Sequence, residues 1–141
     1  MVPRGGWRHT AKKIKEAVNI PVAATNRINT PEIGEELLRD GDADIVALGR
    51  QMLADPDFAI KADQLGSTEA WIGQHHTVAW EPIPSNDLFI ANVLPRTKQI
   101  RLGSGVSILP QHHPVNVAVR LAYLDHLSRG RINCGFGQGG V

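Results

Sequence analysis

The feature that most restricts the fold of this chain is a regular alternation of short apolar runs with amphipathic segments. The runs are rich in β-branched and small apolar residues and read as strands, while helical periodicity marks the segments between them. Apolar runs of this length, largely without polar alternation, are typical of strands buried on both faces of a parallel sheet. The order of elements predicts βαβ units and an α/β fold. The predicted strands are 20–25, 44–49, 69–73, 99–109 and 131–137.

Capping residues mark where the predicted helices begin and end. Threonine, serine or aspartate before a proline is typical of a helix start, and glycine is typical of the residue after a helix end. The first helix is predicted from Ala11, Ile14 and Val18, which share one helical face. The predicted openings of the other helices are Thr30-Pro31, Asp55-Pro56, Ser85 and Pro114, and the predicted stops are Gly41, Gly66 and Gly130.

The number of strands limits what the sheet can become. A complete (β/α)8 barrel takes about 250 residues, whereas this chain has 141 residues and about five predicted strands. We therefore expect a mainly parallel sheet built from barrel fragments, either half-barrel-like or open. Open sheet edges carry unpaired backbone N–H and C=O groups, which favour association. We expect self-association into a dimer, or a rearranged open sheet whose edges are covered internally.

Composition excludes several classes of partner. The formal net charge of +1 gives no electrostatic reason to expect nucleic acid or a membrane surface. No apolar run approaches the roughly 18 residues that a membrane span needs. The only cysteine, Cys134, allows no internal disulfide and is predicted to be an inert core thiol. These features together predict a cytoplasmic protein.

Two strand ends carry groups suited to binding an anion. Asn26 and Arg27 follow the first predicted strand, and Gly49 and Arg50 follow the second, each just before a helix. At this edge of a parallel sheet the helix N-termini offer partial positive charge and free N–H groups. Glycine lets the backbone approach an anion, and arginine binds phosphate with two parallel hydrogen bonds. The pattern predicts a phosphate site.

A simpler interpretation stays open for each arginine. Either side chain can instead pair with a nearby carboxylate such as Asp44 or Asp55. Two arginines in equivalent turns favour the phosphate.

Residues 1–62 resemble the last two βα units of the old yellow enzyme family, closest to its 2,4-dienoyl-CoA reductase branch. The motifs that carry the resemblance are "VPRG", "TNRIN" and "DGDAD". In that family the corresponding turns hold the phosphate of FMN, which implies phosphate contacts from Asn26, Arg27, Gly49 and Arg50. The earlier strands that contact the flavin ring, the catalytic acid and the iron–sulfur cysteines of that family are absent here.

Residues 64–140 resemble the early strands of bacterial luciferase-like, flavin-dependent monooxygenases. The motifs include "HHT", "RTKQIRLGSGV" and "LDHLSRGR". The resemblance implies that His75 lies in the flavin and substrate cavity, although Gln74 stands where the family usually has glutamate. It also implies that Gly103, Ser104 and Gly105 allow close approach of the flavin ring. Some relatives use the deazaflavin F420 in place of FMN, and nothing in these residues separates the two cofactors.

Two groups of residues have simpler interpretations. The pairs His75-His76 and His112-His113 do not predict a metal site, because adjacent strand residues point to opposite faces. The aromatic residues Trp71, Trp80 and Phe89 are interpreted as packing rather than as a stacking platform.

The chain is thus predicted to be a chimera that forms one α/β domain over residues 1–141. Its old yellow enzyme-like segment is 1–62 and its luciferase-like segment is 63–141. The leading hypothesis is an FMN-binding barrel fragment with weak flavin-dependent oxidoreductase activity, in which His75 acts as a base. The competing hypothesis is a folded scaffold without ligand or activity.

Overall fold

The computed structural model describes residues 4–48, 55–77 and 83–139. The chain divides into two compact units, Met1–Lys61 and Ala62–Val141, which are described separately. The boundary falls close to the point where the two sequence resemblances meet. No helix within the described ranges is long and apolar enough to cross a membrane.

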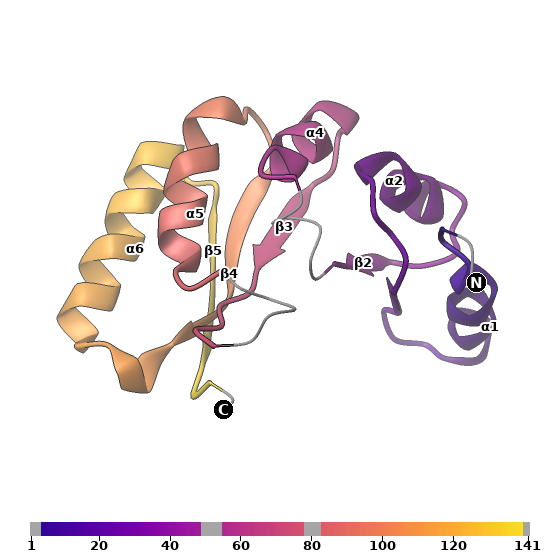
Figure 1. Ribbon diagram of the computed structural model, residues 1–141, viewed down its shortest axis with the longest axis horizontal. Coiled ribbons are helices and arrows are strands. Elements are labelled where there is room, and N and C mark those ends of the chain that lie inside the picture. The colour runs from indigo at the N-terminus through magenta and orange to yellow at the C-terminus, as the bar shows by residue number, and fades with distance from the viewer. Residues whose placement is uncertain (1–3, 49–54, 78–82, 140–141) are drawn as a thin grey trace. The chain divides into compact units, whose positions relative to one another are not determined.

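Unit 1 holds two parallel strands and two helices (Figure 1). In the sheet Ala24 lies opposite Val46, in the register expected of successive βα units. Each strand is only three residues long, so the sheet by itself supplies little stability. The elements are α1 (Arg8–Ala17), β1 (Ala23–Thr25), α2 (Pro31–Arg39) and β2 (Ile45–Ala47).

The predicted caps of α2 are confirmed. The Thr30 hydroxyl accepts the backbone N–H of Ile33 at 3.4 Å, and Pro31 is the first helical residue. Asp40 caps the helix C-terminus and is followed by Gly41 at φ +71°. A side chain at that φ costs free energy that glycine avoids, so Gly41 turns the chain toward β2.

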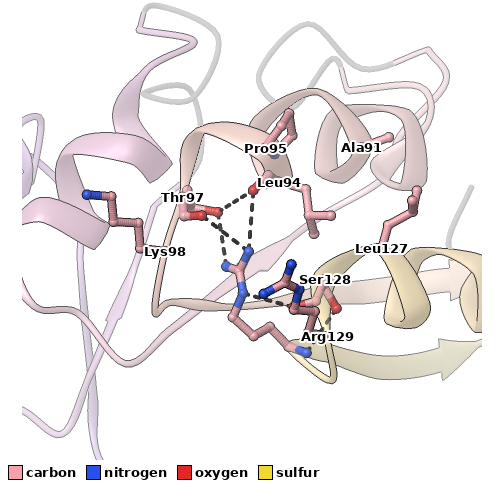
Figure 2. A pocket seen from close by; sticks show the side chains of 9 residues that line it. Ala91, Leu94, Pro95, Thr97, Lys98, Leu127, Ser128 and Arg129 are labelled. Atoms are coloured by element: carbon pink, nitrogen blue, oxygen red, sulfur yellow. Dashed lines mark hydrogen bonds between the residues drawn. The ribbon is translucent and has the colours of Figure 1, made fainter.

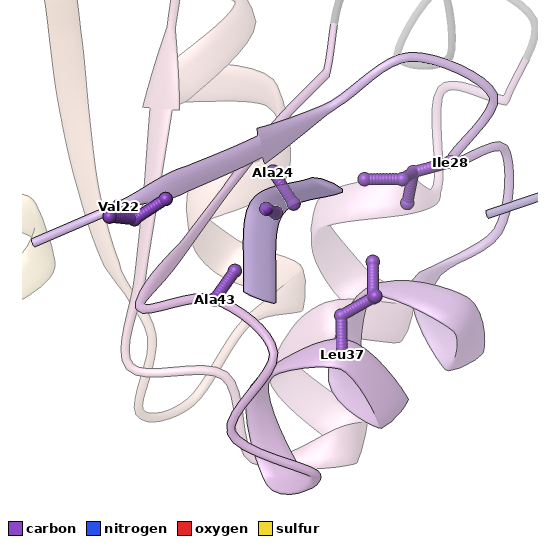
Figure 3. Close-up of a cluster of buried hydrophobic side chains, with 6 residues drawn as sticks. Val22, Ala24, Ile28, Leu37 and Ala43 are labelled. Carbon is purple, nitrogen blue, oxygen red and sulfur yellow. The ribbon is translucent and has the colours of Figure 1, made fainter. Parts of the chain in front are cut away.

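A small apolar cluster joins the strands of unit 1 to its helices (Figure 3). Three of its six members are alanines, so the cluster buries little apolar area. Ala11 is the only buried residue of α1, while Ile14 and Val18 are 49% and 38% exposed. The predicted helix is present, but of the three residues predicted to share one face only Ala11 is buried. The members are Ala11, Val22, Ala24, Ile28, Leu37 and Ala43.

Arg8 connects α1 to α2 and to the turn that follows it. Its guanidinium donates to Asp42 at 2.7 Å, to Glu36 at 2.8 Å and to Asp40 at 2.8 Å. The Arg8 hydrogen bond is the main reason why the pKa values of the Asp40 and Asp42 carboxyls lie below their usual range. Lys12 also pairs with Asp42, at 3.3 Å. The network therefore links α1 to α2 and to the turn after it through the buried Asp42, while its exposed ion pairs each contribute little stability.

Unit 2 holds a three-stranded parallel sheet in the order β3-β4-β5. Leu102 in the central strand lies between Ala70 and Ile132. Helices α5 and α6 lie side by side on one face of this sheet (Figure 1). The elements are β3 (Glu69–Ile72), α5 (Asn86–Val93), β4 (Arg101–Ile108), α6 (Pro114–Ser128) and β5 (Ile132–Gly137), with 3-10 turns η1 (Leu94–Arg96) and η2 (Leu109–Gln111). Helix α4 (Phe58–Leu65) contains the unit boundary.

The five predicted strands and their parallel pairing are confirmed. Among the described residues they form two sheets rather than one, of two and three strands. Ser85 occupies the N-cap position of α5 as predicted, but its side chain makes no capping bond to the backbone. Its hydroxyl donates instead to the carboxylate of Asp87.

Asp63 on α4 fixes the start of the central strand of unit 2. Its carboxylate accepts the backbone N–H groups of Lys98, Gln99 and Ile100 at 2.8, 2.9 and 2.7 Å. Burial raises the pKa of Asp63, but the three N–H donors and the charge of Arg131 outweigh it, so the pKa lies below its usual value. Asp63 therefore stays charged at neutral pH and holds the strand start.

Candidate functional site

The turn after β1 has an unusual backbone. Asn26 and Arg27 are consecutive non-glycine residues with positive φ, at 70° and 61°. The carbonyl of Arg27 accepts the N–H of Gly5 at 2.9 Å, which anchors the turn to the start of the chain. Each such residue costs about 1 kcal/mol or more, and strain of this kind concentrates at functional sites. The predicted phosphate turn is thus a strained turn that the hydrogen bond to Gly5 helps to hold.

The acids proposed as alternative partners of the arginines have other partners. Asp44 pairs with Lys15 at 2.8 Å and accepts the N–H of Val22 at 2.9 Å. Asp55 pairs with Lys61 at 2.6 Å. Arg27 is exposed and forms no ion pair with a described residue. The guanidinium of Arg27 remains available to an anion. Gly49 and Arg50 lie outside the described residues.

Asn29 is a polar residue near this turn that the sequence reasoning missed. Its side-chain Oδ1 is buried and has no hydrogen-bond partner in the described part of the chain. An unpaired buried acceptor is costly, at about 1–3 kcal/mol. A donor from a ligand, such as a sugar or polyol hydroxyl, would satisfy it. The motif "TNRIN" contains the residue, but no spacing rule distinguishes it from an ordinary loop asparagine.

The end of β3 brings together side chains from two strand ends. The Nε2 of His76 lies 2.7 Å from Oε1 of Gln111, which belongs to the η2 turn after β4. The geometry requires the His76 Nε2–H to donate to Gln111, so that nitrogen cannot also accept from Gln74, whose Nε2 is 3.3 Å away. The neighbouring His75 donates its backbone N–H to Ile83 at 3.0 Å. The hydrogen bond to Gln111 thus orients the ring of His76, whereas the histidine predicted to act as a base is its neighbour His75.

The glycine-containing strand β4 is already covered at part of its length. The indole of Trp71 lies against Gly103, where an added Cβ would be 2.7 Å from Cε3 of the ring. Ser104 is buried, and its hydroxyl donates to the carbonyl of Gly135 at 3.0 Å. Gly105 is exposed. Of the three residues predicted to admit a flavin ring, Gly103 and Ser104 contact other parts of the chain.

A cavity of about 620 Å³ in unit 2 lies at the opposite ends of the strands (Figure 2). Arg131 donates to the carbonyls of Leu94, Thr97, Ile100 and Ser128 and to the Thr97 hydroxyl, at 3.0–3.3 Å. At the amino ends of barrel strands such networks serve stability. The cavity contains none of the predicted site residues. It is lined by Ala91, Leu94, Pro95, Thr97, Lys98, Leu127, Ser128, Arg129 and Arg131.

Cys134 lies in β5 as predicted, but its description as a core thiol is wrong. The residue is exposed, because β5 is an edge strand within the described sheet. Partial burial and the charge of Asp125 raise the pKa of its thiol, so it is protonated at neutral pH and weakly reactive. In the described ranges no group of three or more His, Cys, Asp or Glu is arranged to hold a metal ion.

Comparison with known proteins decides the family. The model of the luciferase-like monooxygenase family matches residues 51–141, well over half of the chain. The chain belongs to this family. A 4-hydroxyprotoasukamycin monooxygenase from Streptomyces nodosus subsp. asukaensis is 46% identical over 93 residues, covering 66% of this chain and 25% of the relative. The match to the family model, residues 51–141, includes the whole of unit 2.

A solved structure supports the same fold. The oxygenating constituent of 3,6-diketocamphane monooxygenase from Pseudomonas putida, in complex with FMN, superimposes with a TM-score of 0.58 at 32% identity. The match covers 59% of this chain and 23% of that one. The family fold is an α/β barrel of which this chain is a fragment. The chain spans about a quarter of the length of the monooxygenases that it matches.

The first part of the chain matches a second family. The model of the NADH:flavin oxidoreductase / NADH oxidase family matches residues 3–69. A metal reductase from Desulforamulus reducens is 48% identical over 61 residues, covering 43% of this chain and 9% of the relative. The two family matches overlap over residues 51–69, across helix α4.

Proposed function

We propose that this chain is a flavin-binding barrel fragment that holds the phosphate of FMN at the turn after β1. The observation that carries the proposal is the exposed guanidinium of Arg27 in a strained turn, which forms no ion pair with a described residue, while Asp44 and Asp55 are paired with lysines. A phosphate dianion is the ligand that a free guanidinium at a strand end and a following helix N-terminus bind best. Gly49 and Arg50 are proposed to complete the phosphate site from the next turn.

One further group of unit 1 fits a flavin nucleotide. The buried and unpaired Oδ1 of Asn29 would accept a hydroxyl of the ribityl chain. Bound flavin supplies hydride and electron transfer. We favour FMN over F420 because the P. putida relative is described in complex with FMN, although F420 remains an alternative within the luciferase-like family.

Any catalysis would depend on His75, which we propose as the group that takes or gives a proton. Gln74 next to it is buried and supplies an uncharged amide in place of the carboxylate that the family usually has there. We therefore expect weak flavin-dependent oxidoreductase activity.

We further propose that the chain is a chimera of the two flavoprotein families. The two family matches, which meet across α4, support this origin. The competing function is that of a folded scaffold without ligand or activity. It is favoured by the contacts that already engage Gly103 and Ser104, which leave fewer groups for a flavin ring.

Replacing Arg27 tests the phosphate site. Arg27→Ala, and more strongly Arg27→Ala with Arg50→Ala, should weaken FMN binding by about tenfold or more, because a hydrogen bond to a charged group contributes about 1.5–3 kcal/mol. Riboflavin, which lacks the phosphate, should bind both variants as it binds the unaltered chain. Titration followed by flavin fluorescence measures both affinities.

The matched control is Lys13→Ala, which removes an exposed cation of α1 in the same unit. It should leave FMN affinity unchanged. Equal loss of FMN and riboflavin in the Arg27 variants would place the phosphate elsewhere. No binding of either ligand at high micromolar concentration would favour the scaffold.

We also propose self-association through open sheet edges. Each edge strand of the described sheets has one side without a strand partner, in unit 1 as in unit 2. Such edges recruit other strands. Light scattering at increasing protein concentration should give the mass of a dimer, and a constant monomer mass over the same range would contradict the proposal.

A further inference from the structure

The face of the unit 2 sheet opposite α5 and α6 carries a tryptophan lying flat on glycines. A Cβ added to Gly103 would lie 2.7 Å from Cε3 and 2.9 Å from Cδ2 of Trp71. A Cβ added to Gly135 on the next strand would lie 3.5 Å from Cζ3 of the same ring. The indole therefore extends from β3 across β4 to β5. The ring reaches this position because residue 103 has no side chain.

The indole is also fixed in orientation. Its Nε1–H donates to Oε2 of Glu69 on the same strand at 3.0 Å. With the glycines beneath it and this hydrogen bond at its edge, the ring has little freedom to rotate. Trp71 is nevertheless 48% exposed. One face of a fixed aromatic ring thus packs on the sheet while the other faces solvent, so the interpretation of Trp71 as ordinary packing describes only half of the residue.

Polar groups line the same face of the sheet next to the ring. Alternation along β4 places Arg101 on the side of Gly103, and Arg101 lies opposite Glu69 in the strand register. The guanidinium of Arg101 donates to Oδ1 of Asn133 at 2.9 Å. A carboxylate, a guanidinium and an amide therefore stand beside one aromatic surface. Arg101 also donates to the carbonyls of Gly130 and Ile132, so these polar groups form a fixed rim beside the exposed face of the indole.

We propose that Trp71 is a stacking platform for a planar nitrogen heterocycle, held flat by Gly103 and Gly135. Stacking of a heteroaromatic ring on a tryptophan contributes about 1–3 kcal/mol. The choice of a flavin ring as the ligand rests on the proposed function, but the platform lies in unit 2 and does not involve the phosphate turn of unit 1. The two proposals can therefore fail separately.

Riboflavin binding to the full chain tests the platform without the phosphate. Trp71→Leu should weaken riboflavin binding at least about tenfold, and Trp71→Phe, which keeps a ring, should lose clearly less. The matched control is Trp7→Leu, since Trp7 is 46% exposed and belongs to unit 1. It should bind riboflavin as the unaltered chain does. Affinity is read from flavin fluorescence, and circular dichroism checks that each variant is folded.

Three results would overturn the platform: unchanged riboflavin affinity in Trp71→Leu, tighter binding in that variant, or no measurable binding to the unaltered chain. Tighter binding would show that the flavin ring binds on Gly103 and Gly135 themselves, where the indole of Trp71 would compete with it. Arg27→Ala separates the two proposals. If Arg27→Ala no longer prefers FMN to riboflavin but still binds riboflavin, the phosphate turn is supported and the platform is not affected. If Trp71→Leu loses riboflavin affinity but still prefers FMN, the platform is supported and the phosphate turn is not affected.

Discussion

Arg131→Met should lower the free energy of unfolding of unit 2 by about 3 kcal/mol or more. The guanidinium of Arg131 donates five hydrogen bonds, four of them to backbone carbonyls: Leu94 in η1, Thr97 and Ile100 between η1 and β4, and Ser128 at the end of α6. Methionine has a similar length but no donor, so several acceptors lose their partner in a partly buried place. Chemical denaturation followed by circular dichroism measures the loss.

The neighbouring Arg129 provides the control for this substitution. Arg129 is exposed, caps α6 with a φ of 59°, and lines the same cavity. Arg129→Met keeps a β-carbon at the same backbone conformation and should change the free energy of unfolding by less than about 0.5 kcal/mol. Arg131→Lys should fall between the two, because an ammonium cannot reproduce the planar fork of a guanidinium. Equal effects of the two methionine variants would show that the carbonyl network is not what stabilises unit 2.

The second large effect is expected from Asp63→Asn. An asparagine can accept two of the three N–H groups, but its amide nitrogen would then face the third N–H, so two donors would meet. We expect a loss of about 2–3 kcal/mol in the free energy of unfolding. The control is Asp125→Asn, because Asp125 is exposed and its carboxylate accepts one N–H within the described residues, from Ile132 at 3.4 Å. Its effect should be under about 0.5 kcal/mol.

The pH dependence of the Asp63 variant provides a separate check. The pKa of Asp63 is lower in the folded chain than in the unfolded chain, where an aspartate titrates near about 3.9. Its contribution to stability is therefore full above about pH 4 and is lost as the pH falls through the lower, folded pKa. The difference in unfolding free energy between the unaltered chain and Asp63→Asn should shrink below about pH 4. A constant difference down to pH 2 would contradict the charged network.

Local chemistry made the strands and most helix boundaries predictable. The pair Thr30-Pro31 and the glycine at position 41 act within a few residues of themselves, so their roles can be deduced without tertiary contacts. Ser85 occupies the predicted cap position, but its hydroxyl donates to Asp87, two residues away, and accepts no backbone N–H of the helix, which the local sequence does not reveal. The separation into two sheets was not predictable, since strand pairing depends on contacts distant in the sequence.

The candidate site was predictable only in part. Arg27 could be placed at a strand end because parallel strands present their carboxyl ends to one edge. That Arg27 forms no ion pair within the described part of the chain could not be deduced, because Lys15 and Lys61 pair with the competing acids through tertiary contacts. The position of Trp71 was equally hidden, since it requires glycines 32 and 64 residues further along the chain to lie beneath one ring.

The half-exposed tryptophans give each unit its own optical label. Trp7 belongs to unit 1 and Trp71 to unit 2, and both indoles are partly hydrated in the folded chain. In two variants that each keep only Trp7 or only Trp71, with the other tryptophans replaced by phenylalanine, emission would follow the melting of the half that holds the remaining indole. Coincident midpoints would mean that the two halves cooperate as one thermodynamic body, and separated midpoints would mean that they are joined by the chain alone.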